Sequence, residues 1–144
     1  MNLTRSLLIF LLYARSDEKA VRRLYNRLSK AGASVLMDRK KLLPGQDWQS
    51  EIHQAIFSSD IIIVCLSKQF NKQGGYRHEE VRIALEKANV LPDDLLFIIP
   101  VLLEICEMPE SLQRWQRVDL FESSGYKKLL STLNEYVQDK AFLQ

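Results

Sequence analysis

The side chains of this sequence that could do chemistry lie in three polar segments. They are carboxylates, cations and one histidine, which can move a proton, hold a ligand or stabilise a charge. The segments comprise Arg15 and Asp17, then Asp38 with the cations Arg39–Lys41, and then Tyr76 to Glu80. Most of these charges have an ordinary explanation, because charged loops are usually solvated and acidic residues in a first helical turn complement the helix dipole. We interpret His78 as a surface residue rather than a base or a ligand.

Glu79 and Glu80 are adjacent but not equivalent. A helix that begins near Tyr76 is expected to bury one stripe of side chains, formed by Val81, Ala84, Leu85 and Ala88. Glu80 lies one helical turn before Ala84 and borders this core-facing stripe. Glu79 is expected to face outward, together with Arg82, Ile83 and Glu86. Position alone therefore makes Glu80 the candidate for a functional carboxylate.

Apolar runs predict the strands that must position these residues. Continuous runs such as LLIFLLY are typical of strands buried on both faces of a parallel sheet. Strands are expected at Leu7–Tyr13, Ser34–Met37 and Ile61–Leu66, within Leu95–Leu103, and, as a short last strand, within Gln116–Leu120. Pro100 is awkward in a central strand, so we expect the ladder of hydrogen bonds to stop or kink there.

Amphipathic segments between these runs predict helices. The first is capped by Ser16 and Asp17 and ends at Gly32, the second begins at Trp48, the third begins near Tyr76, and the last contains Tyr126–Val137. The polar segments Asp38–Asp47 and Ser67–Gly75 are expected to be loops.

Strands that alternate with helices predict one α/β domain over residues 1–144. We expect a three-layer, flavodoxin-like fold with a five-stranded parallel sheet of order 2-1-3-4-5 and helices on both faces. In such sheets ligands bind outside the carboxyl ends of the strands, where the strand order reverses. The fold should therefore bring together the loops that follow Tyr13, Met37 and Leu66.

Composition and motifs exclude several classes of protein. A net charge of +2 is too balanced for nucleic-acid binding to be the default. Two cysteines and two histidines supply neither a disulfide framework nor a zinc site, so no metal is expected. The sequence contains no GxGxxG, GxxxxGK[ST] or GxSxG motif. The strand that ends in Cys65-Leu66-Ser67 lacks the aspartate of a two-component receiver.

The apolar run near the N-terminus imitates a short signal peptide, because Arg5 precedes Leu7–Tyr13. Leu12, however, is too large for the position three residues before a cleavage after Ala14. The run is also far below the ~20 residues that span a bilayer. We therefore expect a buried strand, a cytoplasmic location and no membrane partner.

Four motifs together resemble those of a Toll/interleukin-1 receptor (TIR) domain, specifically of its prokaryotic branch. Phe10–Asp17 resembles the first-strand motif F-I-S-Y-x-x-x-D, with Leu12 in place of the usual Ser. Asp38–Trp48 resembles the BB loop, which follows the second strand. Ser58–Ser67 resembles the "sad-strand-S" block, and Tyr76–Leu85 resembles the pattern aromatic-x3-E-[IV]-x2-A-L. The motifs span residues 7–88.

The resemblance implies an NAD+ glycohydrolase, which cleaves the nicotinamide–ribose bond to give nicotinamide and ADP-ribose or a cyclic form of it. NAD+ is then the substrate, and no cofactor is expected. The catalytic glutamate of the family falls on Glu80, and its nucleotide contacts fall on Arg15, Asp38, Leu42, Trp48 and Tyr76. Structural alternatives stay open for three of them, because Trp48 could be core, Tyr76 could only start its helix, and Asp38 could only anchor its loop.

The resemblance also implies partners. Other TIR domains would associate with this one through the BB loop, Asp38–Trp48, to form a homo-oligomer or filament. We expect the chain to be the N-terminal part of a longer protein of bacterial anti-phage immunity, with a fused or separate sensor domain. The alternative is a non-catalytic scaffold that signals by TIR–TIR association, although such members often lack the glutamate found here at Glu80.

Overall fold

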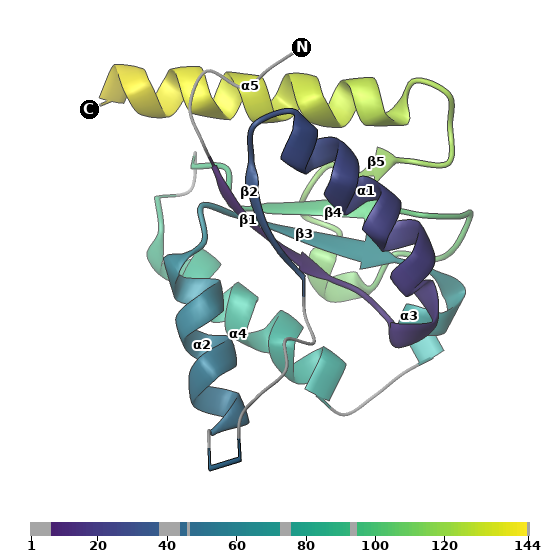
Figure 1. Cartoon of the computed structure of the whole chain (residues 1–144), viewed down its shortest axis with the longest axis vertical. Coiled ribbons are helices and arrows are strands. Elements are labelled where there is room, and N and C mark those ends of the chain that lie inside the picture. The colour runs from purple at the N-terminus through teal and green to yellow at the C-terminus, as the bar shows by residue number, and fades with distance from the viewer. Residues whose placement is uncertain (1–6, 38–43, 46, 73–75, 93–94, 144) are drawn as a thin grey trace.

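The computed structural model describes residues 7–37, 44–45, 47–72, 76–92 and 95–143. Its centre is a sheet of five parallel strands in the order β2-β1-β3-β4-β5 (Figure 1). The strands are β1 (Leu8–Leu12), β2 (Ser34–Met37), β3 (Ile61–Leu66), β4 (Ile98–Leu102) and β5 (Val118–Asp119). This order is the one expected from the sequence. It places β1 beside β3, so the carboxyl ends of these two strands are neighbours.

Helices cover both faces of the sheet, which confirms the three layers (Figure 1). Helices α1 (Glu18–Lys30) and α5 (Gly125–Leu143) lie on one face, and α2 (Trp48–Ser58), α3 (Lys68–Lys72) and α4 (Tyr76–Val90) lie on the other. Successive side chains of a strand point to opposite faces. Leu11 therefore packs in the core under α1 and α5, whereas Leu12 packs in the core under α2 and α4.

Asp60 fixes the start of the central strand. The backbone N–H of Leu8 donates to Oδ2 of Asp60 at 2.9 Å, and the N–H of Asp60 donates to the carbonyl of Leu8 at 2.8 Å. These two hydrogen bonds align the start of β1 with the residue that immediately precedes β3. Its position explains why an aspartate stands between the end of α2 and an entirely apolar strand.

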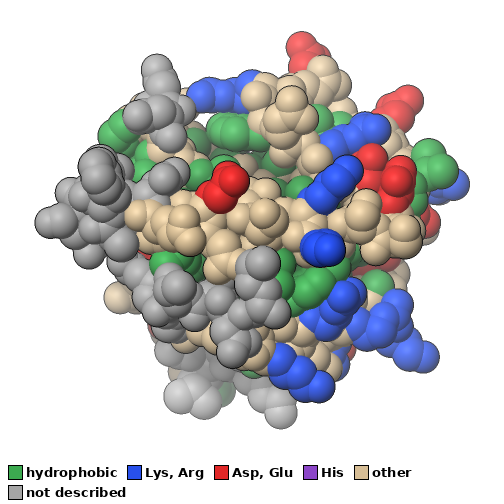
Figure 2. All heavy atoms as spheres, turned by 90° about the horizontal axis from the view of Figure 1, so that it is seen from above, with side chains coloured by type: hydrophobic (Ala, Val, Ile, Leu, Met, Phe, Trp, Pro, Cys, Tyr) green, Lys and Arg blue, Asp and Glu red, His purple; other side chains and the backbone are tan. Residues whose placement is uncertain are grey.

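The face covered by α5 carries a concentration of cations. Figure 2, seen from the α5 side, shows Lys and Arg side chains gathered on one half of this surface. Two arginines of α1 have partners within the domain. The guanidinium carbon of Arg27 lies 3.6 Å from the ring centroid of Tyr126, and Arg22 lies 3.8 Å from a carboxylate oxygen of Glu18. The first of these contacts joins α1 to α5.

The segment Ser67–Gly75, expected to be a loop, contains the short helix α3, so that prediction was wrong over Lys68–Lys72. The hydroxyl of Ser67 accepts a hydrogen bond from the backbone N–H of Phe70 at 3.0 Å, which caps the turn. The side chain of Phe70 is buried in the core below. Tertiary packing of one aromatic residue therefore stabilises a helix that a polar segment does not indicate by itself.

Strand β4 passes through Pro100 and continues to Leu102, so the expected stop or kink is wrong. The N–H of Leu103 donates to the carbonyl of Leu66 in β3. Because backbone N–H groups alternate between the two sides of a strand, the nitrogen of Pro100 faces the β5 side. Strand β5 pairs with β4 only from Val101 onward. The proline therefore removes no hydrogen bond from the sheet.

Gly125, at the start of α5, has no room for a side chain. A Cβ atom there would lie 2.3 Å from the carbonyl oxygen of Asp119 and 2.8 Å from the Cα of Leu120. Both are backbone atoms, which cannot rotate away. Gly125→Ala is expected to lower the free energy of unfolding by about 1–3 kcal/mol, as measured by urea denaturation. Ser123→Ala, at an exposed neighbouring position, is the control, and an equal loss in both variants would contradict the steric explanation.

Candidate active site

Two of the three expected loops meet at the carboxyl ends of β1 and β3. Strand β1 leads into a single turn of 3-10 helix, η1 (Arg15–Asp17), and β3 leads into Ser67. The hydroxyl of Ser67, which is 1% exposed, donates a hydrogen bond to Oδ2 of Asp17. This bond holds the first loop against the end of the third strand. The loop that follows Met37 includes residues 38–43, which lie outside the described residues.

The contact between Asp17 and Ser67 is a feature that sequence reasoning missed. The two residues are 50 positions apart, and each was considered within its own motif. The available signal was the strand order, which puts β1 beside β3 and so brings the residues after them together. Because Ser67 also accepts the N–H of Phe70, one hydroxyl connects η1, β3 and α3.

Glu80 lies just after the first turn of α4 and has 0% of its surface exposed. Helix α4 packs against α2 and β1, and Ala84, on the same helix face, is fully buried. Among the described residues, Glu80 is the one charged side chain that is buried. Its expected core-facing position is confirmed. Because burial of a carboxylate is costly, a fully buried carboxylate is a candidate for function.

Glu79 has different surroundings, although it is adjacent in sequence. Nε of Arg82 donates to its Oε2 at 3.1 Å, and Arg82 also pairs with Glu86. The hydrogen bond from Arg82 lowers the pKa of the Glu79 carboxyl, so this carboxylate stays charged within a surface ion pair. The outward position of Glu79 is confirmed. Ile83, grouped with it by periodicity, is fully buried instead, because α4 contacts both α2 and the sheet and buries a wider face.

The other expected site residues are placed only in part. Arg15 is exposed in η1, at the same edge of the sheet. Asp38 and Leu42 lie outside the described residues. Trp48 and Tyr76 begin α2 and α4, but their side chains lie outside the described part of the structure. The roles of these five residues remain predictions.

Leu12 occupies the position at which the resemblance leads us to expect Ser. Its side chain is fully buried at the end of β1. It packs in the same apolar cluster as Ile56 of α2 and Ala84 of α4. The residue therefore adds apolar packing on the face of the sheet that carries Glu80, where a serine would add a hydroxyl.

Neither cysteine is suited to act as a nucleophile. Burial, and then the charge of Asp17, raise the pKa of the Cys65 thiol far above its usual range. Burial, and then Glu104, raise that of Cys106. Because the thiolate is the reactive form, we expect Ellman's reagent at about pH 8 to leave Cys65 unmodified in the folded Cys106→Ser variant. Urea should expose it, and rapid reaction without urea would contradict its assigned burial.

Two further properties concern the described residues alone. Within them, no three side chains of His, Cys, Asp or Glu lie close enough together to hold a metal ion. In the same part of the chain, no helix is both long and apolar enough to cross a membrane.

Comparison with known proteins identifies a family. A family model described as TIR domain matches residues 9–133. Comparison with curated protein sequences finds no match. Among solved structures, the TIR domain of the Toll-related receptor TRR-2 from Hydra magnipapillata superimposes with a TM-score of 0.70 at 23% identity, covering 86% of this chain and 95% of that chain.

Two other solved structures are similar. The TIR domains of the activated Roq1 resistosome, which recognises the pathogen effector XopQ, match with a TM-score of 0.56 and 28% identity, covering 67% of this chain and 57% of that chain. A prokaryotic SEFIR domain matches with a TM-score of 0.61 and 18% identity, covering 91% of this chain and 98% of that chain.

Proposed function

The chain belongs to the TIR domain family, and from that premise we propose that it is an NAD+ glycohydrolase. Its reaction breaks the bond between nicotinamide and ribose in NAD+ and releases nicotinamide and ADP-ribose or a cyclic form of it. NAD+ is the substrate, and the mechanism requires no cofactor and no metal. Glu80 is the catalytic residue.

The buried carboxylate of Glu80 is the observation that carries this proposal. Nicotinamide in NAD+ is already a cationic leaving group, so it can depart without a general acid. This distinguishes the reaction from ordinary glycoside hydrolysis, which uses two carboxyl groups. The group that needs stabilisation is the oxocarbenium-like ribose. A single carboxylate that is removed from water interacts strongly with this charge in its ionised form and can accept hydrogen bonds from ribose hydroxyls.

Geometry at the sheet edge supports the same assignment. The bond between Ser67 and Asp17 fixes η1 at the carboxyl ends of β1 and β3, and Arg15 belongs to that turn. A guanidinium there suits the phosphates of a dinucleotide. In the proposed site Asp38 and Leu42 contact the nucleotide from the BB loop, and the aromatic rings of Trp48 and Tyr76 line the nicotinamide pocket.

Activity is proposed to depend on self-association. If the BB loop of one subunit completes the pocket of its neighbour, an isolated monomer has only part of an ordered site and turns over slowly. The similar TIR domains of Roq1 belong to an activated resistosome. We propose that a fused or separate sensor clusters this domain in the cytoplasm during bacterial anti-phage defence.

Turnover of a fluorescent NAD+ analogue over a range of protein concentrations tests the proposal. The rate should rise faster than in proportion to protein concentration, and a crowding agent should raise it further. Light scattering on the same samples reports whether the protein has clustered. Clustered, folded protein without turnover would contradict the enzymatic proposal and favour a signalling scaffold.

A further inference from the structure

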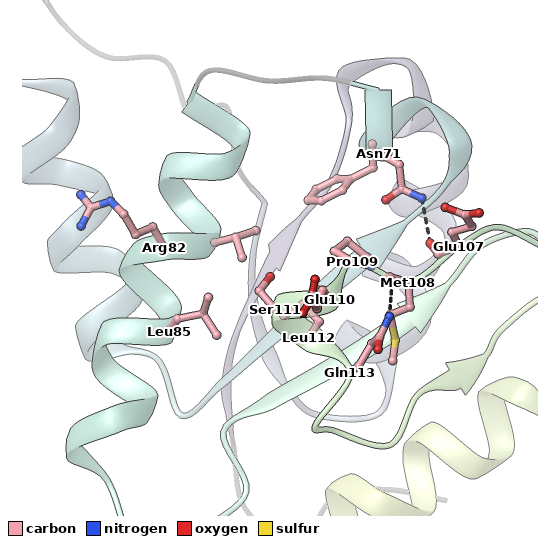
Figure 3. A pocket seen from close by; sticks show the side chains of 12 residues that line it. Asn71, Arg82, Leu85, Glu107, Met108, Pro109, Glu110, Ser111, Leu112 and Gln113 are labelled. Atoms are coloured by element: carbon pink, nitrogen blue, oxygen red, sulfur yellow. Dashed lines mark hydrogen bonds between the residues drawn. The ribbon is translucent and has the colours of Figure 1, made fainter.

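A pocket of about 550 Å³ opens between α3, α4 and the 3-10 turn η2 (Glu110–Leu112), which precedes β5 (Figure 3). Its volume is within the range of small-molecule sites. Apolar side chains from all three elements line it: Phe70, Val81, Leu85, Met108, Pro109 and Leu112. The lining does not include Glu80, the proposed catalytic carboxylate, although Val81 and Arg82 follow it directly in α4.

Charges are unevenly placed around this pocket. Arg82 is the one cation among the described residues that line it. Its guanidinium, however, is held by Glu79 and Glu86 and points away from the cavity in Figure 3. The opposite wall carries Glu107 and Glu110, both exposed. A ligand would therefore meet apolar side chains inside the pocket and two exposed carboxylates among its lining residues, whereas the one guanidinium among the described lining residues points away.

Hydrogen bonds keep the polar wall in place. Nδ2 of Asn71 donates to the carbonyl of Glu107 at 2.7 Å, and Nε2 of Gln113 donates to the carbonyl of Met108 at 3.0 Å (Figure 3). The first of these bonds ties α3 to the segment before η2. Oδ1 of Asn71 is buried and has no hydrogen-bond partner among the described residues. Because this oxygen has almost no accessible surface, a ligand N–H would satisfy it only if the Asn71 amide turned toward the pocket.

We propose that this pocket binds a small organic cation, with an apolar ring and N–H donors such as an amidine or an amine carries. The apolar walls would bury the ring. The two carboxylates favour a positive charge and disfavour an anion, and the pocket is also lined by Phe70, an aromatic residue of the kind that attracts cations. The proposal does not depend on NAD+ cleavage, because none of the pocket residues belongs to the proposed active site.

Three probes of similar shape and different charge test the proposal: benzamidine (+1), benzamide (neutral) and benzoate (−1). Each is titrated into isotope-labelled protein, and changes in backbone amide resonances are followed by NMR. Benzamidine should shift the resonances of residues 70–71, 81–85 and 107–113. It should bind about three- to tenfold more tightly than benzamide, because exposed carboxylates contribute modestly to affinity. Benzoate should bind most weakly.

Two variants distinguish the contribution of the apolar cavity to binding from that of the carboxylates. Leu85→Trp fills the cavity and should weaken benzamidine binding at least about tenfold. The double variant Glu107→Gln, Glu110→Gln leaves the cavity intact. In this double variant, benzamidine should bind only as tightly as benzamide does. The affinity for benzamide should stay the same. Glu135→Gln, on α5, is the matched control and should change neither.

The proposal is overturned by any of three results. Benzoate could bind as tightly as benzamidine, the resonance changes could lie outside the pocket, or the Glu107 and Glu110 double variant could keep the full preference for benzamidine. Absence of binding by all three probes to folded protein would also overturn it. Each readout is binding, so a failure here is distinguishable from a failure of the proposed NAD+ cleavage.

Discussion

Glu80→Gln is expected to reduce NAD+ cleavage at least about a thousandfold while the domain stays folded. The substitution keeps the shape of the side chain and removes its negative charge. A thousandfold loss corresponds to about 4 kcal/mol of transition-state stabilisation. That size is reasonable for a buried group, because no water screens its charge from the developing cation on the ribose. Turnover of the fluorescent NAD+ analogue, at a concentration that supports assembly, is the measurement.

Glu79→Gln is the matched control for this experiment. It makes the same chemical change one residue earlier, at a carboxylate that pairs with Arg82 on the surface. It should retain most of the activity, and both variants should keep the circular dichroism of the parent protein. Full activity in a folded Glu80→Gln variant would remove Glu80 from the mechanism. Equal losses in both variants would show that disturbance of α4, rather than the buried charge, is responsible.

Lys87→Met is expected to lower the free energy of unfolding by about 2–3 kcal/mol. The ammonium group of Lys87 in α4 donates to three carbonyls at the end of α2: Ile56 at 3.5 Å, Phe57 at 2.6 Å and Ser59 at 2.9 Å. It also lies 4.6 Å from the ring centroid of Phe97. Methionine keeps the apolar stem but leaves the helix-terminal carbonyls without this donor. Urea denaturation is the measurement.

Lys127→Met is the control for the lysine variant, because Lys127 is exposed on α5. It should change stability by less than about 0.5 kcal/mol. If both variants lowered the free energy of unfolding equally, the contacts of Lys87 with α2 would not explain the loss. Loss of the hydrogen bonds between Lys87 and the end of α2 should also lower NAD+ cleavage, because α2 and α4 carry Trp48 and Glu80 of the proposed site. That secondary effect should remain smaller than the effect of Glu80→Gln.

Local patterns in the sequence predicted the sheet well. Strands β2 and β3 have the expected bounds, and β1 and β4 lie within the expected runs. A strand buried on both faces must be apolar at every position, and this pattern is visible without any knowledge of neighbours. Helical periodicity was similarly informative for Glu80, because one turn separates it from Ala84, which is also buried.

Predictions failed where a partner distant in sequence decides the outcome. Helix α3 depends on a core position for Phe70, and Pro100 is accommodated because β5 pairs only beyond it. Ile83 is buried because α4 contacts a second helix as well as the sheet. The cavity beside α4 combines residues 70–71, 81–82, 85 and 107–113, which no motif connects.

The sequence by itself determined the order of elements, the parallel sheet and the core-facing position of Glu80 in contrast to Glu79. These follow from hydrophobic period and chain connectivity, which are local properties or topological rules. Only the tertiary structure decided that Ser67 holds Asp17, that Lys87 joins α4 to α2, and that a pocket lies beside η2. Those features are contacts between side chains far apart in the sequence. Their geometry is fixed only when the layers pack together and water is excluded.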